Sequence, residues 1–166
     1  MKYELRKLDN LSGSKASVYS PFIEEEGKTL FDIFLEENIS SFKSELNDIY
    51  SRIHTIGHKV GAREQFFKLK EGKPGDGVCA LYDNPDKNLR LYCIRYGLSL
   101  VILGGGGYKS KDIRKLQEDP KLKKENYLLK EISESIKEKS KFGEIKFVSD
   151  GMDFEGDLTF NDENYE

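Results

Sequence analysis

The chain has 166 residues, of which 37% are hydrophobic and 34% charged. This length suits one domain with one hydrophobic core, and the composition predicts a modest core beneath a heavily charged surface. No apolar run reaches the roughly 20 residues of a membrane span, and the N-terminus lacks the apolar segment of a secretory signal. We therefore expect a cytoplasmic protein without a membrane partner. The two Cys, Cys79 and Cys93, are expected as buried free thiols, and we expect no metal and no cofactor.

The net charge of −3 is unevenly distributed. Seven of the 30 acidic residues lie in residues 149–166, where none of the 27 basic residues occurs, so residues 1–148 carry a net positive charge. A basic body can bind polyanions, and an acidic tail can shield that surface or simply keep the protein in solution.

The first half of the chain predicts a strand over residues 1–8 and a loop over residues 10–20, which are rich in Ser, Gly and Asn. Apolar residues at helical spacing follow in residues 24–38 and 41–56, and Gly57 offers a stop. These two segments predict a helical hairpin that packs on a sheet.

The second half begins with three short strands, over residues 78–82, 89–96 and 98–103, which predict an antiparallel meander. Pro120 begins a helix that runs to about residue 139. Residues alternate on both sides of Asp150-Gly151, which predicts a terminal hairpin. It would dock near the cationic surface or add a strand to an exposed sheet edge.

The predicted fold class is therefore α+β, with a small antiparallel sheet of three to five strands packed against an N-terminal helical hairpin and a C-terminal helix. The predicted organisation is one domain over residues 1–143 and an acidic hairpin or tail over residues 144–166.

Glycine and histidine patterns exclude several kinds of site. The four glycines at 104–107 lack the Gly-Lys-Ser/Thr spacing of a P-loop, so they mark either a bulge or close backbone packing, or a point where a phosphate approaches the backbone. His54 and His58 share a helix face, but no third metal ligand is near them in the sequence.

Cations with interleaved tyrosines are more informative, because they suit RNA: cationic groups hold phosphates and aromatic rings stack on bases. Alternation along the strand over residues 89–96 places Arg90 and Tyr96 on one face and Arg95 on the other. Lysines from the flanking segments can converge on this strand; they are Lys68, Lys70, Lys109 and Lys111.

Several of these motifs together resemble a known family. The pattern FFKLKEG…GVCALYD…LRLYCIRYG-LSLVILGGGGYKSK…DP is similar to the RelE/ParE toxin superfamily, closest to HigB-like toxins of the phage-derived type, over residues 30–139. By this resemblance, Arg90, Tyr108, Lys109 and Lys111 are the candidate catalytic residues. The candidate RNA-binding residues are Lys68, Lys70, Arg95 and Tyr96.

The resemblance implies a toxin of a type II toxin–antitoxin pair that cleaves mRNA on the ribosome without a metal, and whose partner is an antitoxin of the helix-turn-helix type. Arg90 would hold the phosphate, because arginine offers fixed paired donors. The alternative is a ParE-like inhibitor of DNA gyrase, or a non-catalytic partner-binding module. Two departures from the family pattern favour this alternative: Leu81-Tyr82 ends the first meander strand, and the glycine run replaces bulkier residues.

Overall fold

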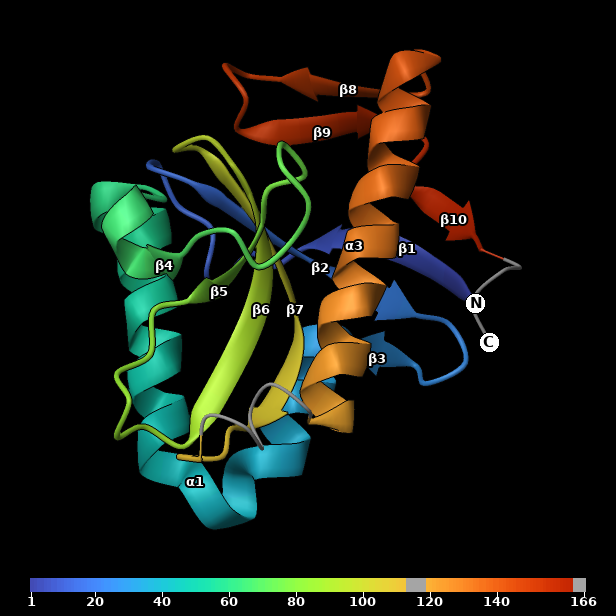
Figure 1. The fold of residues 1–166 in the computed structure, drawn as a ribbon. Coiled ribbons are helices and arrows are strands. Elements are labelled where there is room, and N and C mark those ends of the chain that lie inside the picture. The colour runs from blue at the N-terminus through green and yellow to red at the C-terminus, as the bar shows by residue number, and fades with distance from the viewer. Residues whose placement is uncertain (113–118, 163–166) are drawn as a thin grey trace.

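A computed structural model of the chain describes residues 1–112 and 119–162. Its centre is a twisted sheet in the order β10-β1-β2-β7-β6-β5-β4, with β3 also paired to β2, and a separate β8-β9 hairpin (Figure 1). The strands are β1 (Lys2–Lys7), β2 (Ser17–Ile23), β3 (Lys28–Thr29), β4 (Phe67–Lys68), β5 (Val78–Leu81), β6 (Leu89–Tyr96), β7 (Leu100–Tyr108), β8 (Ile145–Val148), β9 (Asp153–Gly156) and β10 (Thr159–Asn161).

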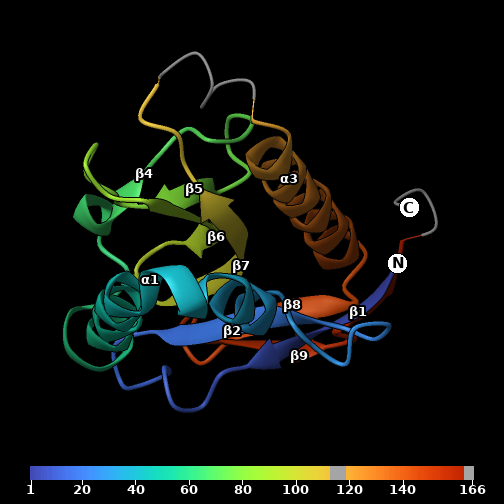
Figure 2. The same cartoon turned by 90° about the horizontal axis from the view of Figure 1, so that it is seen from below.

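Two long helices cover opposite faces of the sheet (Figure 2). They are α1 (Leu30–Thr55) and α3 (Pro120–Lys141), and two short turns, η1 (Ile56–Val60) and η2 (Glu64–Phe66), lead from α1 to β4. Each long helix begins with a side-chain cap. Thr29 and Asp32 form a capping box at α1, and Asp119 caps α3, where Pro120 occupies the first turn.

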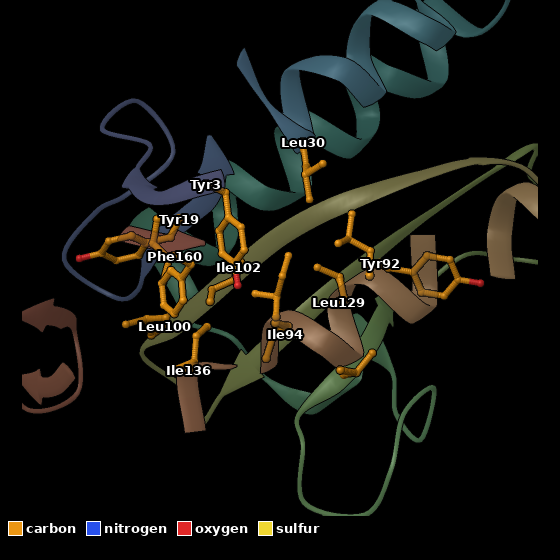
Figure 3. Packing of buried hydrophobic residues seen from close by; sticks show 14 of the residues in the cluster. Tyr3, Tyr19, Leu30, Tyr92, Ile94, Leu100, Ile102, Leu129, Ile136 and Phe160 are labelled. Atoms are coloured by element: carbon orange, nitrogen blue, oxygen red, sulfur yellow. The ribbon is translucent and has the colours of Figure 1, made fainter. Parts of the chain in front are cut away.

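Alternation along the central strands produces two separate cores, because successive side chains of a strand point to opposite faces. Leu100 and Ile102 of β7 pack under α3, whereas Val101 and Leu103 pack under α1. Figure 3 shows the α3 core, in which Leu129 lies beside Ile94 and the ring of Tyr92 closes one end.

The predicted fold class is wrong in three respects. The sheet has eight strands rather than three to five, it is mixed because β2 runs parallel to β7, and the helices lie on both of its faces. The meander itself is present, since β5, β6 and β7 pair antiparallel in sequence order. The sequence predicted a loop over residues 10–20, but β2 begins within this range, and this strand is almost entirely buried at the centre of the sheet.

The predicted helical hairpin is also wrong, because the two apolar segments form the single element α1. Phe42 interrupts it with φ −136° and ψ 38°, which turns the chain without ending the helix. Both arms contribute to the same core, through Phe34 before the kink and Leu46 after it.

The glycine run lies inside β7, buried under α3 and against β6. A Cβ atom at Gly104 would lie 2.6 Å from Leu129, and one at Gly106 would lie 1.8 Å from the carbonyl oxygen of Arg90. The register also shifts between Leu91 and Cys93, opposite this run. The glycines therefore serve a bulge and close backbone packing, which is one of the two roles that the sequence left open.

The acidic tail adds a strand to a sheet edge, as one of its two predicted placements required. β10 pairs antiparallel with β1, and the β8-β9 hairpin covers the end of β6, where Phe147 and Phe154 pack on Tyr96. Lys139 of α3 holds the connection between β9 and β10 by donating to Asp157 and to the carbonyl oxygen of Thr159. Residues 163–166 of the tail lie outside the described residues.

Candidate functional site

A buried carboxylate organises the strongest cluster of charges in the described residues. Asp83 lies two residues beyond the end of β5, and its side chain is only 4% exposed. Its oxygens lie 2.7 Å from Nζ of Lys109, 2.8 Å from Nζ of Lys68 and 3.4 Å from Nε of Arg90. The three cations come from β4, from β6 and from just beyond β7, so the sheet itself brings them together. We call these four side chains the Asp83 cluster.

The Asp83 cluster carries more positive than negative charge. Three cations share one carboxylate, so these four side chains have a net charge of +2. Burial alone would raise the pKa of Asp83, but hydrogen bonds from Lys109 and Lys68 and the charge of Arg90 lower it below its usual value. Asp83 is therefore ionised at neutral pH, and the positive surplus remains. Glu71 also attracts Arg90 electrostatically.

The three cations differ in how far solvent reaches them. The side chain of Lys68 is 30% exposed and that of Arg90 is 12% exposed, whereas that of Lys109 is 3% exposed. Lys109 also donates to the carbonyl oxygen of Asn84 at 2.6 Å. A ligand from solvent can therefore meet Lys68 and the edge of Arg90, while Lys109 acts on it through Asp83.

Two exposed tyrosines adjoin the cluster in sequence, and one of them, Tyr82, also lies beside it in space. Tyr108, which precedes Lys109, is 50% exposed and stacks on Phe42 with ring centroids 6.0 Å apart. Tyr82, which precedes Asp83, is 46% exposed, and Nζ of Lys68 lies 5.7 Å from the centre of its ring. Flat apolar surface beside cations is the pairing that single-stranded nucleic acids require.

Burial rules out two tyrosines as proton acceptors near neutral pH. It raises the pKa of Tyr92, a neighbour of Arg90, and that of Tyr96, so both phenols keep their protons. Tyr96 also lies six residues along β6 from Arg90, roughly 20 Å at 3.3 Å per residue. Tyr96, which was predicted to bind RNA, thus lies at the opposite end of β6 from the Asp83 cluster, under the β8-β9 hairpin.

The remaining predicted residues lie apart from the cluster. Lys70 and Arg95 line a cavity of about 640 Å³ beside β5, and Nε of Arg95 donates to the carbonyl oxygen of Ala62 at 2.6 Å. Lys111 is exposed, three residues beyond the end of β7. The structure therefore groups Lys68, Arg90 and Lys109 around Asp83. It places Lys70, Arg95, Tyr96 and Lys111 elsewhere, and the ring of Tyr108 against Phe42 of α1.

Sequence reasoning missed Asp83 and Glu45. Asp83 lies two residues beyond an entirely apolar strand, but Asp86 follows it closely, and the sequence does not distinguish the two carboxylates. Glu45 of α1 accepts hydrogen bonds from the backbone N–H groups of Asn88 and Leu89, each at 2.9 Å. No sequence signal links it to a loop more than 40 residues away.

Neither a candidate metal site nor a candidate membrane-spanning helix is found in the part of the chain that the structure describes. It contains no group of three or more His, Cys, Asp or Glu side chains able to hold a metal ion. His54 and His58 stack on each other, 4.0 Å between ring centroids, and His58 contacts the carbonyl oxygen of Asn10. Neither helix among the described residues has the length and apolar character needed to cross a membrane.

Comparison of the chain with protein-family models, with curated proteins and with solved structures finds no match. The resemblance to the toxin superfamily thus rests on its short motifs alone, and a function has to be argued from the geometry of the cluster.

Proposed function

We propose that this protein is a toxin that binds mRNA at the Asp83 cluster and cleaves it on the ribosome. The observation that carries the proposal is the net charge of +2 on Lys68, Asp83, Arg90 and Lys109, next to the exposed ring of Tyr82. An RNA phosphate would offset the surplus charge, and this ring would stack on a base beside it. A cognate antitoxin would restrain this activity in the cell.

Cleavage in this proposal needs no metal. The ribose 2′-oxygen attacks the adjacent phosphorus while its proton passes to a base, and the 5′-oxygen leaves with a proton from an acid, giving a 2′,3′-cyclic phosphate and a 5′-hydroxyl. Arg90 and Lys68 would hold the charge that develops on the phosphate oxygens. Lys109 is buried and fixes Asp83, so it is a positioning residue here. Tyr82, exposed and 5.7 Å from Nζ of Lys68, would stack on a base, whereas Tyr108 stacks on Phe42 of α1 and has no assigned step.

The test is RNA cleavage in a ribosome-containing extract, with Arg90→Ala and Lys68→Gln compared with the wild type. Arg6→Ala is the matched control, because Arg6 lies on β1 at the other side of the sheet and pairs only with Glu4 among the described carboxylates. We expect cleavage by the wild type and the control, and strongly reduced cleavage by both cluster variants. An Arg90→Ala variant that is folded and fully active would remove Arg90 from the site.

A second candidate is a partner-binding module of the same chain that does not cleave RNA. The observation in its favour is that Arg90 and Lys109 already pair with Asp83 and are largely shielded from solvent. Binding without cleavage, in the same extract, would support this candidate. Inhibition of DNA supercoiling by gyrase would identify gyrase as the partner.

A further inference from the structure

The turn between β5 and β6 supports the Asp83 cluster from one side. Asp83 precedes this turn and Arg90 follows it closely, and Lys109 makes two hydrogen bonds to it. The backbone N–H group of Lys109 donates to Asn88 at 2.8 Å, and its Nζ atom donates to Asn84 at 2.6 Å, each time to the carbonyl oxygen. The shape of residues 84–88 therefore sets where Asp83, Arg90 and Lys109 lie relative to one another.

One side chain of α1, that of Glu45, holds residues 84–88 in place. Glu45 accepts from the backbone N–H groups of Asn88 and Leu89, both at 2.9 Å, and from the side-chain amide of Asn88 at 3.2 Å. A carboxylate that receives several N–H donors holds them more strongly than a neutral acceptor, because each hydrogen bond is charge-assisted. Glu45 thus joins the helix to the segment that carries the cluster.

The kink in α1 directs Glu45 and its neighbour Phe42 to the same end of the sheet. Phe42, at the kink, stacks on Tyr108, and Glu45, just after the kink, holds Asn88. The kink region of α1 therefore contacts both the strand end beside Lys109 and the turn that Lys109 binds.

We propose that Glu45 is a positioning residue for the anion site at the Asp83 cluster, an inference that rests on the proposed RNA-binding function. It acts by holding residues 84–88 in the shape that keeps Lys109 against Asp83 and leaves Lys68 and Arg90 facing the ligand. Loss of Glu45 lets this turn move, so that Lys109 becomes accessible and the cationic surface loses its alignment.

The experiment uses Glu45→Ala and Glu45→Gln in the full chain, with Glu36→Gln as control. Glu36 is an exposed carboxylate of α1 that pairs with Lys28 and does not contact the turn. Two quantities are measured on variants whose circular dichroism matches the wild type. The first is acylation of Lys109 by an amine-reactive reagent, read by mass spectrometry. The second is the affinity for a single-stranded RNA oligonucleotide at several salt concentrations.

We expect Glu45→Ala to increase Lys109 acylation several-fold. RNA binding should weaken by about tenfold, because binding must then order a turn that the charge-assisted hydrogen bonds of Glu45 hold in the wild type. Glu45→Gln keeps one acceptor oxygen, so its values should lie between those of Glu45→Ala and the wild type. The slope of log affinity against log salt should fall in Glu45→Ala and stay unchanged in Glu36→Gln, because only misaligned cations change the number of phosphate contacts.

Three outcomes separate the inference from the function on which it rests. Unchanged Lys109 acylation in Glu45→Ala overturns the inference. Increased acylation with unchanged RNA affinity also overturns it, provided that Lys68→Gln weakens binding. If the wild type binds no RNA while Glu45→Ala exposes Lys109, the proposed function fails and the support of the cluster by Glu45 stands.

Discussion

Replacing Asp83 by Asn should destabilise the protein more than any other single change of charge in the described residues. The substitution keeps the size of the side chain and removes the one negative charge that three cations share. The ammonium group of Lys109, whose side chain is 3% exposed, then loses the carboxylate that pairs with it and keeps only neutral acceptors such as the carbonyl oxygen of Asn84. Removing one partner of a buried ion pair costs about 3–5 kcal/mol, and we expect that loss in the free energy of unfolding. For a chain of this length it lowers Tm by about 10 °C.

Urea denaturation at pH 7 measures this loss, with Asp48→Asn as the control. Asp48 is an exposed carboxylate whose side chain is 54% accessible and pairs with Arg52 on the surface, so its replacement should cost less than about 1 kcal/mol. A penalty for Asp83→Asn as small as that of the control would refute the reasoning.

The pH dependence of the same difference gives a second check on Asp83. Its pKa is lowered in the folded protein, so its contribution to stability is complete above the unfolded pKa of about 3.9 and is lost as pH falls through the lower folded value. The gap between wild type and Asp83→Asn should therefore be constant from pH 7 to about pH 5 and shrink below about pH 4. A gap that shrinks near neutral pH instead would mean that Asp83 is not ionised as described.

Three further substitutions test other parts of the structure. Gly106→Ala should cost more than about 2 kcal/mol in unfolding free energy, because the new Cβ meets backbone, whereas Gly107→Ala, whose Cβ has no neighbour nearer than 3.4 Å, should be close to neutral. Lys139→Met should speed hydrogen exchange in β10 and β1 and leave β6 protected. The hydrogen bond from Lys139 lowers the pKa of Asp157 to about 2, so acid should fray β10 in the wild type as the pH falls below about 4. Lys68→Gln should change unfolding free energy by less than about 1 kcal/mol and lower the salt slope of RNA binding by about one, and an unchanged slope would place Lys68 away from RNA.

Local patterns in the sequence were sufficient for the meander and for the C-terminal helix. Alternation in β6 and the Pro120 start of α3 depend on neighbours a few residues away, and these features are where the sequence indicated them. The central strand β2 could not be recognised in this way. Its pairing with β7 joins residues more than 80 positions apart, and its seven residues include two Ser and a Pro, which are more typical of loops.

Alternation and motif similarity also located part of the candidate site. They indicated Arg90, Lys109 and Lys68, whose positions follow from strands that the pattern reveals. They did not indicate Asp83 or Glu45. The burial of these two carboxylates, and the groups with which they pair, depend on how the turn after β5 packs against α1. Tyr96 was placed on the same strand face as Arg90, but distance along the strand separates them, and strand period alone carries no information on which end is covered.

The charge of the Asp83 cluster links stability to the proposed function. A cluster selected for stability alone would balance its charges, or would be replaced by apolar side chains, since a buried ion pair is often no more stable than a hydrophobic contact. Here one carboxylate holds three cations, and the two with access to solvent, Lys68 and Arg90, lie at the outer side. Asp83 keeps the cations folded in place but does not neutralise them, and the charge that remains is available to a phosphate. Folding and the proposed ligand binding thus place opposite demands on this cluster, because a second acidic residue would stabilise the free protein and weaken the proposed binding of RNA.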